Sequence, residues 1–336
     1  MVVIGILLAS AVAAGALYQF IGAARDARTC TAPGTMVDVG GRRLHLTSVG
    51  SGTPTVVFES GIAASSLSWS RVLPEVAKFT RACAYDRAGL AWSDLPQHPP
   101  TTARMVDDLR RVLDRAAIAA PHVLVGHSFG AFLVCAYASQ HPDSVAGLVL
   151  LDPPTEWQHA TPERSRLLRG GVQLSRIGGI LARLGVVRAC LTLVSGGAPS
   201  VPRTVVRIFG PTAARTVERL VGEVRKLPPE VHPIVRALWC QPKCFRAMAE
   251  HLGALGETAA FVAGMTSLPD VPLVIISSGD QSPQTIAQHR HLARLSTQSR
   301  LIVAARSGHW IQFDEPDVVV TAVRDIIDRT RRTSAA

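Results

Sequence analysis

The sequence is poor in aromatic and charged side chains. Phe, Trp and Tyr make up 5% of its 336 residues, and Asp, Glu, Lys and Arg make up 18%. So low a charged fraction, beside 47% hydrophobic residues, excludes a disordered chain and indicates a buried core of useful size. The sequence has neither an internal repeat nor a low-complexity tract. Its length suits one large domain with an insertion, or two small domains.

Acidic residues are outnumbered by basic ones, 25 to 35, and the formal net charge is +10. Such an excess favours anionic partners: nucleic acid, anionic lipid or an acidic substrate. The sequence has no Cys/His finger, no RNP-type aromatic stretch and no compact block of Lys and Arg. We therefore expect no nucleic-acid partner and interpret the arginines as solubilising surface residues. Attraction to a membrane surface is the second interpretation.

The six cysteines are not spaced as metal ligands. Their spacing does not repeat, and no matching His pair completes a zinc site, so we expect no metal and no other cofactor. Cys83 and Cys135 stand in apolar runs and are interpreted as buried thiols. A disulfide involving Cys190, Cys240 or Cys244 would require an oxidising compartment, and we favour thiols.

The longest apolar run occupies residues 2–24. It has no polar face, which makes a buried helix of a globular domain the weakest interpretation. Its length suits a helix that spans a bilayer. An Ala-rich stretch at 11–16 resembles a signal-peptidase site, so a cleaved signal peptide is the competing interpretation. The apolar region is long for a signal peptide and no Lys or Arg precedes it, and we therefore predict an uncleaved single-pass membrane anchor.

The anchor is predicted to occupy residues 1–24, and residues 25–35 to form a linker. Arg25 and Arg28 follow the apolar run and no basic residue precedes it. By the positive-inside rule this places the C-terminal domain in the cytoplasm, whereas a basic leader ahead of residue 1 would reverse the orientation.

Strands and helices alternate after the linker. The pair Gly40-Gly41 separates two alternating runs, as in a β-hairpin. Farther along, short apolar runs typical of buried strands alternate with runs of helical periodicity. This alternation predicts an α/β fold with a mostly parallel sheet covered by helices on both faces. The predicted strands are 37–39, 43–49, 55–58, 82–85, 122–125, 145–151, 273–276 and 300–304, and the predicted helices are 69–79, 105–119, 129–139, 285–295 and 317–330.

The alternation stops between residues 153 and 268. This stretch is rich in Arg, has helical periodicity and contains no convincing strand. We interpret 154–268 as a helical cap inserted above the C-terminal edge of the sheet, where the sites of α/β proteins lie. The core is then made of 36–153 and 269–332, and the cap is expected to select the substrate.

The motif that carries chemistry is Gly126-His127-Ser128-Phe129-Gly130, a G-x-S-x-G. An apolar strand precedes it and an apolar helix follows it, which is the context of a nucleophile elbow. Such a turn strains the backbone at Ser128, and the two glycines remove side chains that would collide there. The alternative is an ordinary turn with a capping Ser. We prefer the elbow because partners for a nucleophile follow downstream.

A serine nucleophile needs a base, and the base needs an acid that orients it. His309 follows the last predicted strand and is the predicted base. Asp280 follows the strand 273–276 in a Gly-Asp turn, gives the chain order Ser, Asp, His, and is the predicted acid. Asp152 is the alternative acid, because it also ends a strand. Its two following prolines favour a structural role.

An oxyanion hole needs two backbone N–H groups. The residue after the nucleophile, Phe129, supplies one, and the loop after the strand 55–58 supplies the other. Gly61 in that loop allows close backbone approach, and the N–H of Ile62 is the better candidate donor.

With these residues placed, the sequence over about 36–329 resembles the α/β-hydrolase superfamily, in its fold-1 group of capped enzymes. Ser60-Gly61 stands where many relatives carry His-Gly. The segment 85–93 resembles the family's D-x-R-G-x-G-x-S loop, with Ala88 and Ala91 in place of glycines. The segment 308–316 resembles the catalytic-His segment. The apolar leader followed by 37–41 is similar to a subgroup of anchored hydrolases.

The resemblance implies a hydrolase whose chemistry depends on its nucleophile. Relatives with Asp at the elbow are haloalkane dehalogenases or epoxide hydrolases, so Ser128 favours cleavage of an ester or related acyl bond through an acyl-enzyme. A lipophilic small molecule is the expected substrate. An acyltransferase and a carbon–carbon bond hydrolase use the same triad and are alternatives. A non-catalytic binding protein is a third alternative, although such proteins usually lose a triad member, and Ser128, Asp280 and His309 are all present.

Overall fold

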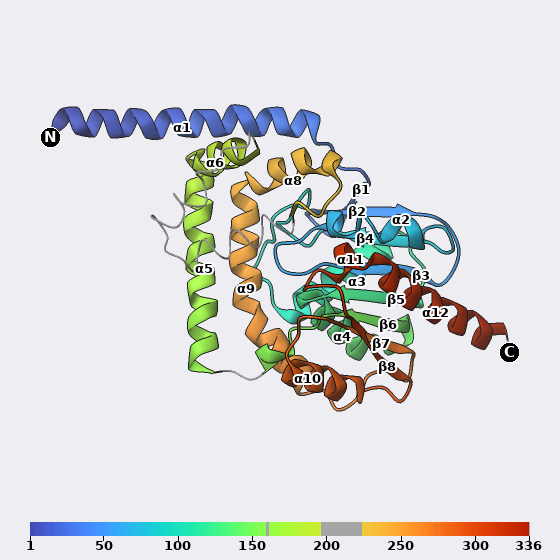
Figure 1. Ribbon diagram of the computed structural model, residues 1–336. Helices are drawn as coiled ribbons and strands as arrows, with labels where there is room; N and C mark the ends of the chain where they lie inside the picture. The colour runs from blue at the N-terminus through green and yellow to red at the C-terminus, as the bar shows by residue number, and fades with distance from the viewer. Residues whose placement is uncertain (159–160, 196–223, 336) are drawn as a thin grey trace. The chain divides into compact units, whose positions relative to one another are not determined.

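A computed structural model describes residues 1–158, 161–195 and 224–335 (Figure 1). Its central element is an eight-stranded sheet with the strand order β1-β2-β4-β3-β5-β6-β7-β8. β2 pairs antiparallel with β1 and β4, and all other pairs are parallel, as the alternating pattern predicts. The strands are β1 Thr35–Asp38, β2 Arg43–Val49, β3 Thr55–Glu59, β4 Ala82–Tyr85, β5 His122–His127, β6 Val145–Leu151, β7 Leu273–Ser278 and β8 Ser299–Ala304.

Helices cover both faces of this sheet (Figure 1). Side chains of α3, α4 and α10 form one apolar core with one face, and those of α2, α11 and α12 form a second core with the other. Burial on both faces explains why β3, β5 and β6 are buried at every position and appear in the sequence as continuous apolar runs. These helices are α2 Leu73–Val76, α3 Thr102–Arg115, α4 Phe129–Gln140, α10 Pro283–Ala293, α11 Ile311–Asp314 and α12 Pro316–Ala335, with short 3-10 turns η1 Ser66–Trp69 and η2 Pro142–Ser144.

The predicted hairpin joins β1 to β2. Gly40 and Gly41 have φ values of 101° and 77°, in the left-handed region that favours glycine. The prediction of one helix over 69–79 is wrong, because the chain forms η1 and then the single-turn α2. Pro74 stands in the first turn of α2, where the missing proline N–H costs nothing. The indole of Trp69 is buried and donates to Ser60 Oγ, 3.0 Å away.

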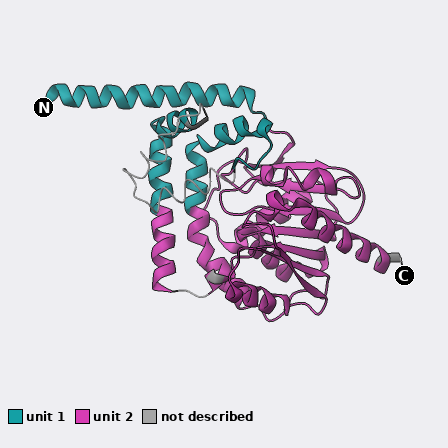
Figure 2. Cartoon of the chain, viewed as in Figure 1, with its two compact units in different colours: residues 1–31, 173–249 teal, residues 32–172, 250–336 magenta. Residues whose placement is uncertain are grey.

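Between β6 and β7 the described residues form helices and turns but no strand, as predicted. They are η3 Thr155–Gln158, α5 Pro162–Arg183, α6 Val186–Ser195, η4 Pro229–Val231, α8 His232–Trp239 and α9 Pro242–Ala263. The compact units divide this insertion (Figure 2): residues 1–31 belong with 173–249, and 32–172 belong with 250–336. The division at 154 and 268 therefore stays a prediction from the sequence. The middle of the predicted cap, 196–223, lies outside the described residues.

The N-terminal helix α1, Val2–Thr29, is long and apolar enough to cross a membrane, with a mean hydropathy of 2.0 over an 18-residue window. Within its own compact unit, its C-terminal half packs against other helices. A Cβ on Gly185 would lie 2.5 Å from the carbonyl oxygen of Gly15, so the two backbones approach closely. Gln19 is buried, donates to the Cys240 carbonyl at 2.8 Å and accepts from Arg188 Nε at 2.9 Å. Residues 2–14 are exposed throughout.

No disulfide joins any of the six cysteines, all of which lie in the described part of the chain. Cys83 and Cys135 are buried, as predicted. Burial raises the pKa of the Cys135 thiol to about 12, so this side chain is a neutral part of the core.

Candidate active site

The strained turn predicted at Ser128 is present between β5 and α4. Ser128 has φ 53° and ψ −122°, and α4 begins at the next residue. The side chain is partly exposed although the residues around it are buried. Its backbone N–H donates to the carbonyl of Leu151 at the end of β6, 2.8 Å away. These features together present the Ser128 hydroxyl at the C-terminal edge of the sheet.

The two glycines of the motif are required by space. A Cβ on Gly126 would lie 2.5 Å from the carbonyl oxygen of Gly130. A Cβ on Gly130 would lie 2.7 Å from the carbonyl oxygen of Ser60, in the loop that follows β3. The elbow and this loop therefore touch through backbone atoms, and Gly130 sets their separation.

Gly130→Ala is expected to lower the free energy of unfolding by about 1–3 kcal/mol, because the new methyl group must displace backbone of the β3 loop. Urea denaturation of both proteins checks this. Gly253→Ala is the matched control, since Gly253 lies in α9 with nothing within 4 Å of its Cβ position. That control should be neutral or stabilising by up to about 1 kcal/mol, since Ala favours a helix over Gly. A neutral Gly130→Ala would contradict the close approach.

His309 lies after β8 and holds a hydrogen bond with Asp152. Its Nδ1 is 2.7 Å from Asp152 Oδ2. The Asp152 carboxylate is fully buried, whereas the imidazole is 24% exposed. An ionised carboxylate can only accept, so Nδ1 carries the proton and Nε2 is left with its lone pair. This is the tautomer that a general base needs.

Three donors hold the Asp152 carboxylate. Besides His309, the backbone N–H of Ser278 donates to Oδ1 at 3.1 Å and Gln281 Nε2 donates to Oδ2 at 2.8 Å. Burial alone would raise the pKa of Asp152, but these hydrogen bonds and the His309 charge outweigh it and lower the pKa below its ordinary value. Asp152 is therefore ionised at neutral pH and can stabilise an imidazolium.

The structure differs from the preferred sequence assignment of the acid. Asp280 is exposed, and its Oδ1 accepts a hydrogen bond from the hydroxyl of Ser278 at 2.6 Å. The carboxylate on the imidazole is that of Asp152, the alternative. Asp152 has φ 44°, and its backbone N–H donates to the Ile276 carbonyl of the neighbouring strand. This turn at the end of β6 directs the Asp152 side chain to His309.

His127, inside the elbow, contacts the His309 segment. Its Nε2 donates to the backbone carbonyl of His309 at 2.8 Å, and the two ring centroids are 4.8 Å apart. Burial and the nearby His309 lower the pKa of His127 to about 3, so the ring is neutral and its proton is on Nε2. His127 thereby links the nucleophile's turn to the loop of the base, a role that sequence reasoning missed.

The loop after β3 lies against the elbow. A Cβ on Gly61 would be 3.2 Å from His127 Nδ1 and 3.5 Å from Ser128 Cβ. This close approach places the next residue, Ile62, beside the nucleophile. Phe129 is the first residue of α4, and the N–H groups of a first turn have no partner within the helix. The two backbone donors proposed from the sequence therefore lie in segments that flank Ser128.

A buried guanidinium shapes the same loop. Arg87 pairs with Glu59 and donates to the backbone carbonyls of Ser60 and Gly61. Tyr85 donates its hydroxyl proton to the other Glu59 oxygen. Burial raises the pKa of Glu59, and the Arg87 charge opposes that rise. These contacts fix the backbone that carries the candidate donor Ile62.

An apolar cluster flanks Phe129. It contains Met105, Leu133, Ala254 and Leu255, and partly buried Ile62, Trp157 and Leu168 pack against it. The side chain of Phe129, next to the candidate nucleophile in the sequence, is therefore packed in an apolar cluster that includes residues of α9. Within residues 1–158, 161–195 and 224–335, no three His, Cys, Asp or Glu side chains are grouped as metal ligands would be.

Comparisons with known proteins agree with the fold. The family model for the alpha/beta hydrolase fold matches residues 54–186, which contain the elbow and Asp152. The chain is 33% identical over 132 residues to the probable transporter efuK of Hormonema carpetanum, a match that covers 37% of this chain and only 19% of that protein. It is 23% identical over 294 residues to the 2-(acetamidomethylene)succinate hydrolase of Mesorhizobium japonicum, covering 87% of this chain and 94% of the relative.

Solved structures resemble the whole fold. A thermophilic esterase from Thermogutta terrifontis matches with a TM-score of 0.64 and 19% identity, over 88% of this chain and 97% of that one. An enol-lactonase from Burkholderia xenovorans matches with a TM-score of 0.60, 19% identity, and 88% and 100% coverage. These likenesses confirm the predicted fold class.

Proposed function

Because the chain belongs to the α/β-hydrolase superfamily, we propose that it is a serine hydrolase that cleaves an ester or related acyl bond. Ser128 is the nucleophile, His309 the base and Asp152 the acid. The observation that carries this proposal is the contact of the Asp152 carboxylate with His309 Nδ1, in a chain whose elbow presents a strained serine. The relatives that are named as a hydrolase, an esterase and an enol-lactonase support the same class.

The proposed reaction has two halves. Ser128 Oγ attacks the acyl carbon while His309 Nε2 takes the hydroxyl proton, and the carbonyl oxygen becomes an oxyanion. The N–H groups of Ile62 and Phe129 donate to that oxyanion. The imidazolium then gives its proton to the leaving alcohol, and the acyl-enzyme forms as the bond to that alcohol breaks. Water attacks the acyl-enzyme with His309 again as base, and Ser128 recovers its proton as the carboxylic acid leaves.

The apolar cluster beside Phe129 supports a lipophilic acyl group. Each buried methylene contributes about 0.8 kcal/mol to binding, close to fourfold in affinity. Hydrolysis of p-nitrophenyl esters of two to twelve carbons tests both parts of the proposal. We expect kcat/KM to rise over the first several carbons. An enzyme that hydrolyses none of the esters would overturn the proposed chemistry, and a rate that falls steadily from acetate would overturn the lipophilic preference.

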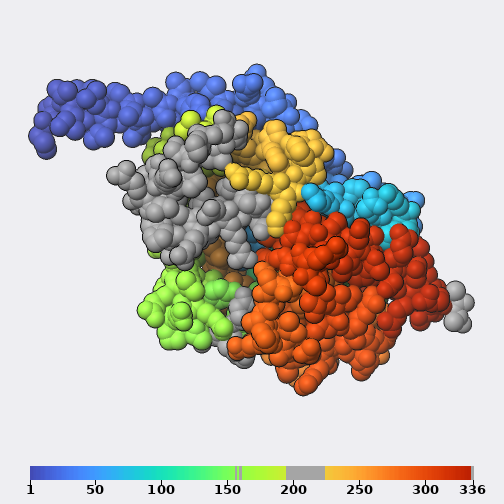
Figure 3. All heavy atoms as spheres, viewed as in Figure 1, coloured from blue at the N-terminus to red at the C-terminus, as the bar shows by residue number. Residues whose placement is uncertain are grey.

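We further propose that α1 anchors the protein to a membrane by its exposed N-terminal half. Residues 2–14 are exposed and, apart from Ser10, apolar, and Figure 3 shows the start of α1 without neighbouring atoms on the face that it draws. Thirteen helical residues reach about 20 Å, less than the hydrocarbon core of about 30 Å. The packed residues around Gln19 and Arg188 belong to the same compact unit. Deep insertion of residues 2–14 would therefore bring that unit to the membrane surface.

The double substitution of Leu7 and Leu8 by Arg is expected to release the full chain from membranes. Each charge costs about 2.5–3.5 kcal/mol in the hydrocarbon region. Sedimentation with vesicles before and after carbonate extraction measures this. Val49→Arg is the control, because Val49 is an exposed apolar residue at the end of β2, outside α1. Recovery of only an N-terminally processed soluble form from cells would instead establish a signal peptide.

A further inference from the structure

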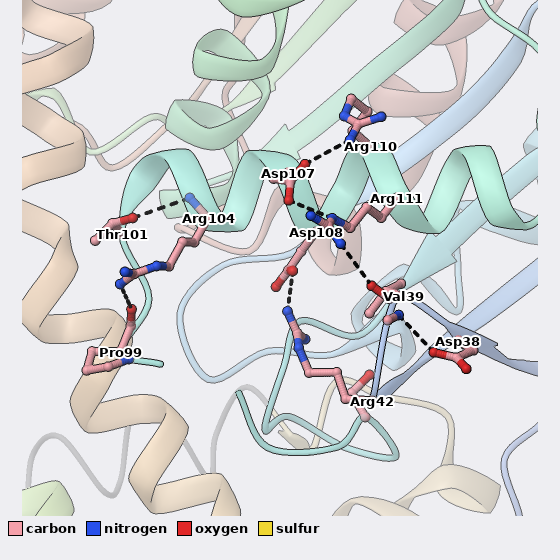
Figure 4. Close-up of polar contacts among 12 residues, drawn as sticks. Asp38, Val39, Arg42, Pro99, Thr101, Arg104, Asp107, Asp108, Arg110 and Arg111 are labelled. Atoms are coloured by element: carbon pink, nitrogen blue, oxygen red, sulfur yellow. Dashed lines mark hydrogen bonds and ion pairs between the residues drawn. The ribbon is translucent and has the colours of Figure 1, made fainter. Parts of the chain in front are cut away.

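A cavity of about 180 Å³ adjoins the Arg87 side chain, away from the residues of the proposed triad. It is bordered by the hairpin of β1 and β2, the N-terminal part of α3, the segment 96–100 and His251 of α9, all within one compact unit. Figure 4 shows the polar side of this region, with Arg42, Arg104 and Asp108 on the same side of α3. None of Ser128, His309 and Asp152 lines it.

The lining carries more positive than negative charge. Arg42 pairs with Asp108 and Arg111 pairs with Asp107, so these charges balance (Figure 4). Arg104 is different: its Nη1 donates only to the Pro99 carbonyl, 2.9 Å away, and no ion pair with a described carboxylate is formed. An exposed guanidinium that has no counter-charge among the described residues therefore lines the cavity.

Side chains of the inner lining keep nitrogen atoms without partners. Arg87 Nε and His251 Nδ1 are buried and have no hydrogen-bond partner among the described residues, and the same holds for Arg42 Nη1. Arg87 and His251 are 3% and 2% exposed. A buried donor left unpaired costs about 1–3 kcal/mol. Two guanidinium donors, and an imidazole nitrogen that donates or accepts according to its tautomer, therefore leave this cavity with polar groups that a ligand could bind.

The remaining lining limits what that ligand can be. Val39, Ala88 and Met105 make part of the cavity lining apolar. The volume of the cavity accommodates an anionic group and only a few further heavy atoms of the ligand. Asp107 and Asp108 would repel a dianion such as phosphate more than a monoanion. The planar guanidinium of an arginine can donate two parallel N–H hydrogen bonds to the two oxygens of a carboxylate.

We propose that this cavity binds a small organic monocarboxylate, with its carboxylate toward Arg104 and Arg42 and its short apolar body toward Met105. Arg87 also donates to the carbonyls of Ser60 and Gly61. The bound ligand would therefore lie one side chain away from the loop that carries Ile62. Binding itself does not depend on the proposed hydrolase activity.

Isothermal titration of the full chain in detergent tests the proposal with butyrate, its neutral isostere butyramide, and inorganic phosphate. We expect saturable binding of butyrate, and binding of butyramide weaker by about tenfold or more, because hydrogen bonds to a charged group supply most of the affinity. Phosphate should bind more weakly than butyrate, because Asp107 and Asp108 repel a dianion more than a monoanion. Butyrate should raise the midpoint temperature of unfolding more than butyramide or phosphate does at the same concentration, because a ligand that binds the folded state stabilises it.

Arg104→Gln separates this cavity from other anion sites. The substitution should weaken butyrate about tenfold or more, whereas Arg104→Lys, which keeps the charge without the fork, should weaken it less. Arg329→Gln is the matched control, because Arg329 of α12 lines a second hollow that also contains both arginines and aspartates: Arg300, Arg332, Asp325 and Asp328. Butyrate bound as a product at Ser128 would be insensitive to Arg104→Gln. Equal affinities of the wild-type chain and Arg104→Gln, or tighter binding of phosphate, would overturn the proposal.

Discussion

Ser128→Ala is expected to lower kcat for ester hydrolysis by about 10⁶, because no neighbouring group can replace the attacking oxygen. The folded state should persist, since the side chain is partly exposed and the turn depends on backbone contacts and on Gly126 and Gly130. Rates on the best p-nitrophenyl ester, with urea denaturation as a check of stability, measure both effects.

Ser282→Ala provides the control for this loss. The Ser282 side chain caps α10 by accepting from the Thr285 N–H at 3.1 Å. Its removal should cost about 1 kcal/mol of stability and leave kcat unchanged. A Ser128→Ala protein that keeps more than a small fraction of the activity would contradict the assignment of the nucleophile.

Asp152→Asn is expected to lower kcat by about 10⁴ with a modest change in KM. An amide in place of the carboxylate can donate to Nδ1, which would move the ring proton to Nε2 and remove the base. The partners Ser278 and Gln281 also lose the charge that they bind. Asp152 can hold the His309 tautomer and stabilise the imidazolium only while its carboxylate is ionised. The lowered pKa of Asp152 keeps it in that form at neutral pH.

Asp280→Asn is the matched comparison, measured on the same ester. Asp280 is exposed and its carboxylate contacts the Ser278 hydroxyl. Its replacement by Asn should therefore lower kcat by less than about tenfold. If Asp280→Asn proved the more damaging of the two, the acid would move to Asp280, and Ser128 and His309 would keep their proposed roles.

The elbow was predictable because its determinants are local. The apolar run 122–125 in β5, the two glycines and the apolar start of α4 all lie within twenty residues, and their geometry follows from backbone sterics. The order of strands and helices was predictable for the same reason, since each element has its own periodicity.

The acid was harder because two aspartates end neighbouring strands. β6 and β7 are adjacent and parallel, so the side chains of Asp152 and Asp280 both reach the C-terminal edge of the sheet. What decides between them is the turn at Asp152, with φ 44°, and the donors Ser278 and Gln281, 126 and 129 residues away. One signal was present in the sequence: Asp152 ends the strand predicted to follow the elbow, although the prolines after it suggested a structural role.

Two supporting contacts had no local signal. His127 bonds to a carbonyl 182 residues away, and Arg87 holds a loop 26 residues upstream. The resemblance to the D-x-R-G loop marked the Arg87 segment without giving its partners. Gln19 lies within the apolar run 2–24, and no neighbouring residue in the sequence indicates that its amide is held by Cys240 and Arg188.

The most direct test of the central claim is to label the full chain with a fluorophosphonate and locate the adduct by peptide mass spectrometry. The proposal predicts one modified residue, Ser128, with labelling abolished in Ser128→Ala and slowed by Asp152→Asn more than by Asp280→Asn. A chain that is not labelled, or an adduct on another serine that persists in Ser128→Ala, would contradict it.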